Sequence, residues 1–204
     1  MQNETSLPAV TVGLDNYQSL AERTSKQPEE LTPLDNFHTA ALYGGMRFGI
    51  AAGNCANDLK RRLAYGKVMP PGSDADSFGK VTVDASVEPI TLTVQQFRLV
   101  HAVLGLMSEA GELMDQLSAH IFAKQPLDEV NIKEEFGDTF WYLAEGHNAV
   151  GAVFQQTMQT NIDKLRARYG DKFSEAAALT RDLTKERAVL EGSRPPTDDG
   201  GSPQ

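Results

Sequence analysis

Two pairs of acidic residues, each with a three-residue spacing, interrupt segments that are otherwise apolar. The stretch GLMSEAGELMD contains Glu109 and Glu112, and the stretch EEFGD contains Glu135 and Asp138. At about 100° per residue, a three-residue step places both acids of a pair on one stripe of a helix. Each stripe borders an apolar face, so antiparallel packing of the two helices through their apolar faces would bring four carboxylates close together at the rim.

Such a cluster needs a compensating charge. Two like charges about 4 Å apart repel by roughly 4 kcal/mol at an effective dielectric near 20. A divalent cation removes this repulsion, and Mg²⁺ in particular takes hard oxygen ligands and usually keeps waters or substrate phosphates beside them. The alternative is that each pair is a solvated helix face. Glu134 competes with Glu135 for the inward position, and helical periodicity favours Glu135 because it lies nearer the apolar edge.

A third segment supplies the opposite charge. If Met158 and Ile162 face the core, Asn161, Lys164 and Arg168 share a bordering stripe. An amide followed by two cations suits a polyphosphate, because Arg binds phosphate oxygens through two parallel hydrogen bonds and Lys binds them as a point charge. A solvated basic face is again the alternative. The basic run KRR at 60–62 could also touch phosphate, although a solvated helix end is the preferred interpretation. Trp141 could stack on a base, but packing in the core or an interface is preferred because it lies away from the carboxylate stripe.

Helices must position these side chains. Apolar residues recur at three- and four-residue steps in 95–122, 127–149 and 152–169, and Ile132, Phe136, Phe140, Leu143 and His147 share one face of the second segment. Further helices are expected at 15–24, at 34–65 with bends or breaks at its glycines, and at 173–191. Two short β-branched runs, VTVD and ITLTV, indicate a small hairpin. The predicted fold is an all-α helical bundle with a small inserted segment.

Length and composition limit the possible functions. The 204 residues suit one domain, which we place at 14–191 with an insertion at about 34–94 and flexible termini at 1–13 and 192–204. The formal charge of −9 opposes binding to nucleic acids or anionic membranes. We find neither an apolar run of membrane-spanning length nor a signal-peptide pattern, and a single cysteine excludes an internal disulfide. These features favour a cytoplasmic protein.

The motifs resemble those of the MazG-like family of all-α nucleoside triphosphate pyrophosphohydrolases. The family signature is ExxE, a spacer and then ExxD, and here EAGE at 109–112 and EFGD at 135–138 are separated by 22 residues. LDNYQSLAERT, HAVLGLMSEAGELMDQL, EEFGDTFWYLA and NIDKLRARY resemble the first to fourth helices of the family. The resemblance covers residues 14–25 and about 97–190. The sequence of these segments is most similar to phage-encoded members of the family.

The resemblance implies a site and a reaction. Glu109, Glu112, Glu135 and Asp138 would be the catalytic residues and would bind Mg²⁺, with Mn²⁺ as a substitute, whereas Asn161, Lys164 and Arg168 would contact the triphosphate. The metals would polarise phosphorus-bound oxygens and lower the pKa of a water for in-line attack. The products would be a nucleoside monophosphate and pyrophosphate. A homo-oligomer, dimer or tetramer, in the host cytoplasm is expected for a phage-encoded member.

Three functions remain open on the sequence. The first is hydrolysis of purine (deoxy)nucleoside triphosphates such as dGTP or GTP during control of a phage nucleotide pool. The second is a pyrimidine-specific enzyme acting on dUTP or dCTP, because base selection depends on the shape of the pocket. The third is a non-catalytic helical module that binds a partner. The segment 34–94 departs from the family pattern because it is longer than the usual link between the first two helices.

Overall fold

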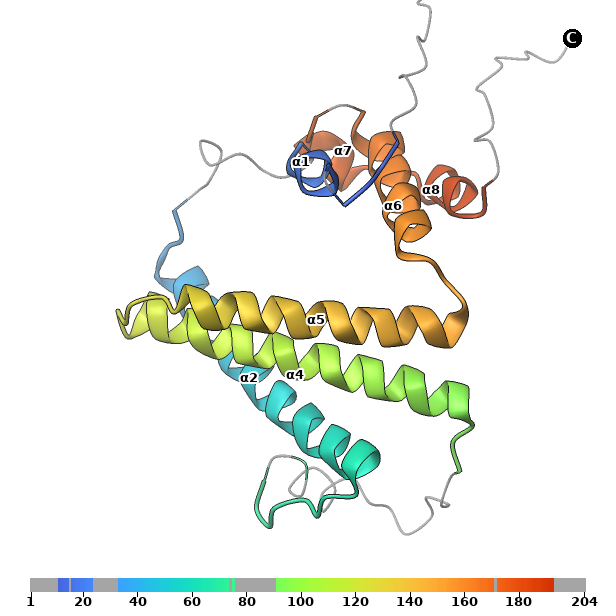
Figure 1. Cartoon of the computed structure of the whole chain (residues 1–204). Helices are drawn as coiled ribbons and strands as arrows, with labels where there is room; N and C mark the ends of the chain where they lie inside the picture. The colour runs from blue at the N-terminus through green and yellow to red at the C-terminus, as the bar shows by residue number, and fades with distance from the viewer. Residues whose placement is uncertain are drawn as a thin grey trace, which may run out of the picture. The chain divides into compact units, whose positions relative to one another are not determined.

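The computed structural model describes residues 11–14, 16–23, 33–73, 75, 91–170 and 172–192. All regular structure in these ranges is helical, which confirms the prediction of an all-α protein (Figure 1). None of the helices in the same ranges is both long and apolar enough to cross a membrane. The helices are α1 (Tyr17–Glu22), α2 (Asn36–Tyr65), α4 (Val94–Phe122), α5 (Glu129–Val150), α6 (Phe154–Tyr169), α7 (Glu175–Leu179) and α8 (Leu183–Leu190).

The chain divides into two compact units. Pro33–Ala152 forms one unit and contains α2, α4 and α5. Met1–Thr32 and Val153–Gln204 form the other unit, which contains α1, α6, α7 and α8. The single domain over 14–191 stays a prediction, and the predicted flexible termini fall mostly on residues outside the described part.

Helix α4 is the centre of the unit Pro33–Ala152, because it packs against both α2 and α5. Figure 1 shows α4 and α5 running side by side in opposite directions, with α2 crossing α4 obliquely. Side-chain caps fix where these helices begin: Asp35 accepts a hydrogen bond from the backbone N–H of His38, and Asp128 accepts from those of Val130 and Asn131. The segment interpreted as an insertion therefore contributes a main packing partner of α4.

The predicted hairpin is not confirmed. VTVD lies outside the described residues, and the described part of ITLTV contains no strand. Instead, the Thr93 hydroxyl accepts a hydrogen bond from the backbone N–H of Gln96 at 3.2 Å, and the Gln96 side chain accepts one from the N–H of Thr93 at 2.9 Å. This capping box starts α4. The predicted helix at 173–191 is also interrupted, at 180–182, and forms α7 and α8.

The expected breaks in α2 do not occur, because two of its glycines serve as contact points for another helix. A Cβ atom placed on Gly53 would lie 2.6 Å from the Cα of Gly111 in α4, and one on Gly49 would lie 2.0 Å from the Met114 sulfur. The missing side chains allow the two backbones to approach closely. This contact explains why a helix with several glycines stays continuous and crosses α4 at this point.

Replacing Gly53 by alanine is expected to destabilise this unit by roughly 2 kcal/mol, because a methyl group forced against backbone has no room to move. Gly44 provides the matched control on the same helix, since a Cβ placed there would meet no atom of another described element within 4 Å. Gly44→Ala is expected to stabilise by up to about 1 kcal/mol through helix propensity. Urea unfolding can be followed by fluorescence of Trp141, the single tryptophan. Equal effects of both substitutions would contradict the close approach at Gly53.

Helix α5 packs on α4 through a face other than the predicted one. Its buried residues are Glu135 and Tyr142, whereas Phe136 is 51% exposed and Phe140 is 66% exposed. The Tyr142 ring occupies the space above Gly105 of α4, where a Cβ would lie 2.2 Å from a ring carbon. The expectation that apolar faces join these helices is therefore wrong. The stripe that carries the acids is turned toward α4 instead.

Candidate functional site

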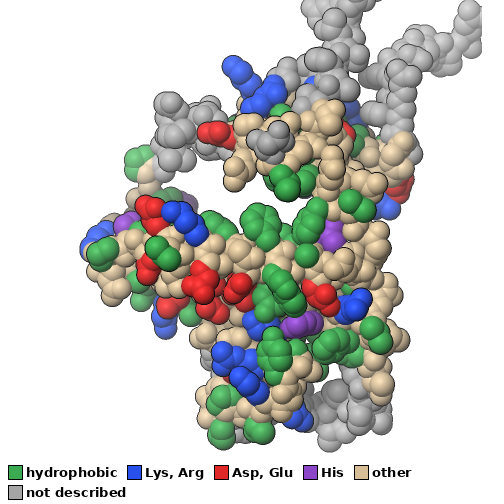
Figure 2. All heavy atoms as spheres, viewed as in Figure 1, with side chains coloured by type: hydrophobic (Ala, Val, Ile, Leu, Met, Phe, Trp, Pro, Cys, Tyr) green, Lys and Arg blue, Asp and Glu red, His purple; other side chains and the backbone are tan. Residues whose placement is uncertain are grey.

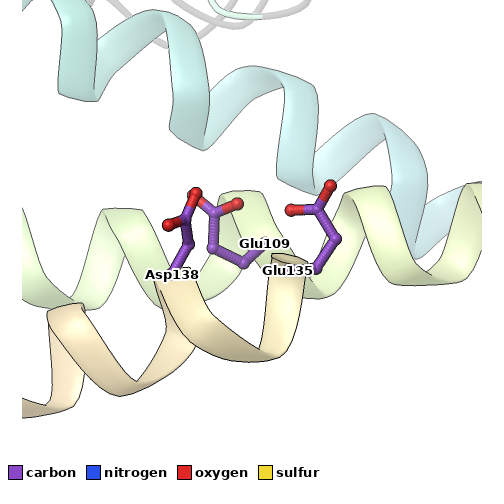
Figure 3. Close-up of side chains that lie close together, drawn as sticks. All are labelled: Glu109, Glu135 and Asp138. Carbon is purple, nitrogen blue, oxygen red and sulfur yellow. The ribbon is translucent and has the colours of Figure 1, made fainter. Parts of the chain in front are cut away.

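Three of the four predicted carboxylates meet where α4 and α5 pack together. Glu109 of α4 and Glu135 and Asp138 of α5 each place a carboxylate oxygen within 4.8 Å of the others (Figure 3). Glu109 and Glu135 are 4% and 5% exposed, whereas Asp138 is exposed. Figure 3 shows the carboxylates turned toward the side on which α2 crosses. The packing of Tyr142 on Gly105 brings the acidic stripes of the two helices together.

The fourth carboxylate lies on the wall of the same cavity. Glu112 is one turn beyond Glu109 on α4, and it lines a cavity of about 310 Å³ together with the other three acids. The Ser108 hydroxyl donates a long hydrogen bond to Glu112, at 3.4 Å. Glu134 also lines the cavity but is exposed, so Glu135 is the inward member of that neighbouring pair.

The surroundings of Glu135 and Glu112 make ionisation of these two side chains unfavourable. Burial, a hydrogen bond shared with Glu109 and the charges of Glu112 and Glu109 raise the pKa of Glu135 to about 7, although the Asn131 amide opposes this by donating a hydrogen bond to Glu135 at 3.0 Å. Burial and the charge of Glu109 also raise the pKa of Glu112. The folded chain therefore holds carboxylates in an arrangement that a cation would stabilise.

A buried lysine from α2 provides part of that compensation. Lys60 is 7% exposed, and its Nζ donates to Glu109 at 3.2 Å and to the Ser108 hydroxyl at 3.3 Å. The ammonium also lies 4.9 Å from the centre of the Tyr142 ring. Hydrogen bonds from Lys60 to Tyr142 and Glu109, and the Glu109 charge, outweigh the effect of burial and raise the pKa of Lys60. A desolvated lysine thus remains charged beside the carboxylates.

The interpretation of the run at 60–62 as a solvated helix end is wrong for Lys60. The helical period of the sequence could have identified Lys60 as a buried residue. The buried residues of α2 are Met46, Ile50, Gly53, Ala56 and Lys60, which follow one another at steps of three and four residues. Lys60 continues this stripe, so the helical period that defines the face toward α4 also places the lysine on it.

The cavity has walls of opposite charge. The acidic wall consists of Glu109, Glu112, Glu134, Glu135 and Asp138. Across from it, α2 and the residues just after it contribute a basic wall, which we define as Lys60, Arg61 and Lys67, with Asn57 and Tyr65 beside them. Figure 2 shows acidic side chains gathered along α4 and α5 next to Lys and Arg side chains on α2. A ligand carrying both cationic and anionic groups would match these walls.

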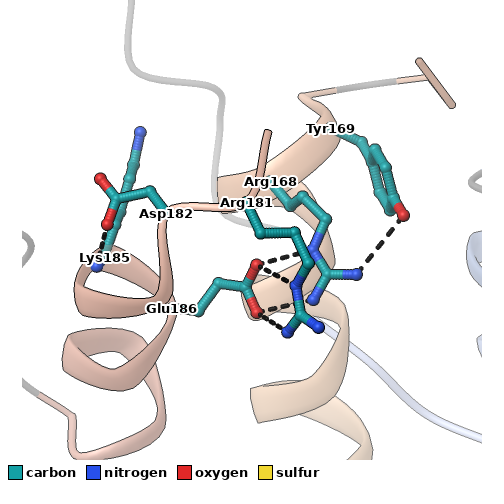
Figure 4. Close-up of polar contacts among 6 residues, drawn as sticks. All are labelled: Arg168, Tyr169, Arg181, Asp182, Lys185 and Glu186. Carbon is teal, nitrogen blue, oxygen red and sulfur yellow. Dashed lines mark hydrogen bonds and ion pairs between the residues drawn. The ribbon is translucent and has the colours of Figure 1, made fainter. Parts of the chain in front are cut away.

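The residues predicted to contact a triphosphate belong to the other unit. Asn161, Lys164 and Arg168 lie on α6, and all three are partly exposed. The guanidinium of Arg168 donates to both carboxylate oxygens of Glu186, at 2.7 and 2.6 Å (Figure 4). Arg168 therefore already has a strong anionic partner within its own unit, and the role of these three residues toward a substrate stays a prediction.

The three converging acids fit a hard divalent cation. Their donors are carboxylate oxygens alone, which Mg²⁺ and Mn²⁺ prefer, whereas zinc sites usually contain thiolate or imidazole ligands. The oxygen atoms lie close enough together for one ion to contact all three after small side-chain rotations. The raised pKa of Glu135 indicates that the groups around it do not compensate its charge, although Lys60 pairs with Glu109.

No family model, curated protein or solved structure matches the chain. Functional inference therefore depends on the motif, on the geometry of the cavity and on the chemistry of its walls.

Proposed function

We propose that this protein is a Mg²⁺-dependent nucleoside triphosphate pyrophosphohydrolase that converts a (deoxy)nucleoside triphosphate to the monophosphate and pyrophosphate. The observation that carries the proposal is the convergence of Glu109, Glu135 and Asp138 from two helices. These acids occupy the ExxE and ExxD positions of the motif that resembles MazG-like enzymes. A solvated helix face, the alternative for each pair, does not account for the burial of Glu109 and Glu135.

The acidic residues of the cavity would have two roles in this reaction. Glu109, Glu135 and Asp138 would hold Mg²⁺, with Mn²⁺ as a substitute. The bound cation would stabilise charge on phosphoryl oxygens and lower the pKa of a water molecule. Glu112 lies at the cavity wall with a raised pKa, which suits a carboxylate that accepts a proton from the attacking water. The proposed substrate is dGTP or GTP, and dUTP or dCTP is the alternative.

The proposed enzyme acts as a homo-oligomer. Large apolar side chains on the described surface of the unit Pro33–Ala152 support self-association, among them Phe48 at 74% exposed and Phe140 at 66% exposed. Figure 2 shows hydrophobic side chains lying along α5. Sedimentation of the purified chain gives its mass in solution and thus tests this part of the proposal.

Replacing Glu112 by glutamine is expected to abolish hydrolysis while the helical circular dichroism signal persists, because the change removes the charge of the side chain without altering its size. The assay incubates the protein with a panel of nucleoside and deoxynucleoside triphosphates and Mg²⁺ and separates the products by chromatography. We expect kcat to fall by at least about 100-fold, because a positioned general base typically contributes that much to a rate. Unchanged turnover would exclude Glu112 from the reaction.

The products distinguish the candidate functions. A monophosphate with pyrophosphate supports the proposed reaction, whereas a diphosphate with phosphate indicates a different cleavage. Absence of turnover with every nucleotide favours the non-catalytic module. Glu129→Gln serves as the control, since Glu129 is exposed at the start of α5 and forms an ion pair with Lys133, which is exposed as well.

A further inference from the structure

A cation bound by Glu109 would compete with an interaction that Lys60 makes. Lys60 is buried at the crossing of α2 and α4, and its Nζ donates to Glu109 at 3.2 Å. Glu109 is also one of the three acids whose oxygens converge on a common point. An ammonium and a divalent cation that share one carboxylate repel each other, so each weakens the hold of the other on Glu109.

The surroundings give Lys60 a second anionic partner when a nucleotide is present. It belongs to the basic wall of the cavity with Arg61 and Lys67, opposite the carboxylates. A phosphate chain held by a cation at the acidic wall would bring its remaining oxygens within reach of the basic wall. The four-carbon stem of lysine allows its ammonium to move between partners, and each of its three protons can be donated separately.

We propose that Lys60 is a shared positioning and substrate-binding residue: it neutralises Glu109 in the metal-free protein and transfers its hydrogen bonding to a substrate phosphate in the loaded site. This inference rests on the proposed function and adds to it a phosphate contact from α2. Lys60 thus opposes binding of the metal alone and favours binding of metal together with nucleotide. The two ligands bind cooperatively because the nucleotide provides a new partner for the displaced ammonium.

The test measures two affinities that the substitution shifts in opposite directions. Lys60→Met is expected to tighten binding of Mn²⁺ alone, measured by electron paramagnetic resonance, by about tenfold, the factor that corresponds to removing one competing charged hydrogen bond. The same variant is expected to raise KM for the Mg²⁺–nucleotide complex by at least about tenfold. A residue that only supports the fold would weaken both interactions.

Two further variants serve as a second test of Lys60 and as a control for loss of charge. Lys60→Gln is also neutral but can donate to Ser108 and Glu109, so it tests the same charge effect if the methionine variant does not fold. Arg62→Gln removes an equal charge from an exposed residue of α2 whose side chain donates to the carbonyl of Gly66. We expect Arg62→Gln to leave Mn²⁺ affinity and KM within about twofold of wild type, because exposed charges are screened.

Several results would overturn the inference. Mn²⁺ affinity that is unchanged or weaker in both neutral variants would show that Lys60 does not compete for Glu109. Tighter Mn²⁺ binding with an unchanged KM would exclude the transfer to phosphate. Failure of the proposed function is distinguishable, because a wild-type protein that hydrolyses no nucleotide still allows the Mn²⁺ comparison. A wild-type protein that binds no Mn²⁺ even with a nucleotide present would exclude both proposals.

Discussion

A chain with glutamine in place of Glu135 is expected to lose hydrolysis by at least about 1000-fold and to be more stable than wild type at pH 8 in the absence of metal. The loss of activity follows from removing one of the three converging carboxylates that would hold the proposed Mg²⁺. The gain in stability follows from removing a charge that the folded chain holds at a cost. Opposite effects on activity and stability are the expected signature of a binding site that is strained when empty.

The stability of the metal-free protein is expected to fall as pH rises, because of Glu135. The folded chain raises the pKa of Glu135 from its ordinary 4.5 to about 7, so between these values the folded state binds a proton more tightly than the unfolded state. The stabilising contribution of protonated Glu135 is fully present below pH 4.5 and is lost as pH rises through 7. Metal-free wild type should therefore become less stable between about pH 5 and pH 8, and Glu135→Gln should reduce that slope.

Urea unfolding in the presence of a chelator, followed by fluorescence of Trp141 on α5, measures this effect in the unit that contains the site. We expect the glutamine variant to be more stable at pH 8 by about 1–2 kcal/mol, a value reduced for contact of the cavity with solvent. Glutamine can still accept the hydrogen bond from Asn131, so packing is preserved. A variant that is less stable than wild type at pH 8 would argue against strain at Glu135.

The extent to which the fold can be predicted depends on the kind of signal. Helical periodicity places α4, α5 and α6 to within a few residues, because caps at Thr93 and Asp128 and glycines at 151 and 170 limit them. The same periodicity does not reveal which face of α5 packs on α4. That choice depends on the fit of Tyr142 over Gly105, a pairwise contact between distant residues that no single-helix pattern contains.

In the candidate site, too, helical periodicity predicts which residues share a stripe but not which contacts form between helices. Spacing alone places Glu135 and Asp138 on one stripe and Glu109 on a partner stripe, and the structure brings these three together. Sequence reasoning misses the burial of Lys60, because a basic run usually indicates a solvated helix end. The burial depends on the crossing of α2 and α4 at Gly53 and Gly111. Glycine usually indicates a break in a helix, whereas here it allows close approach of two backbones.

Glu186→Gln is expected to destabilise the packing of α8 on α6 by roughly 3 kcal/mol, because breaking a buried charge pair leaves the remaining charge without compensation. Glu186 is 4% exposed and accepts hydrogen bonds from Arg168 at 2.6 Å and Arg181 at 2.7 Å. These bonds, chiefly that from Arg168, lower the pKa of Glu186 to about 2. The stabilisation is therefore present above pH 4.5 and is lost as pH falls toward 2.

Hydrogen exchange measured by mass spectrometry reports this effect, since Trp141 lies in the other unit. Backbone amides of α6 and α8 should exchange faster in Glu186→Gln, whereas Glu191→Gln, which removes the exposed pair with Arg187, should change exchange little.

The Glu186→Gln variant also tests the predicted contact of Arg168 with a triphosphate. If Glu186 withholds Arg168 from the substrate, the substitution frees the guanidinium and lowers KM. If the pair is purely structural, α6 loosens and KM does not fall, which would contradict release of Arg168 to the substrate.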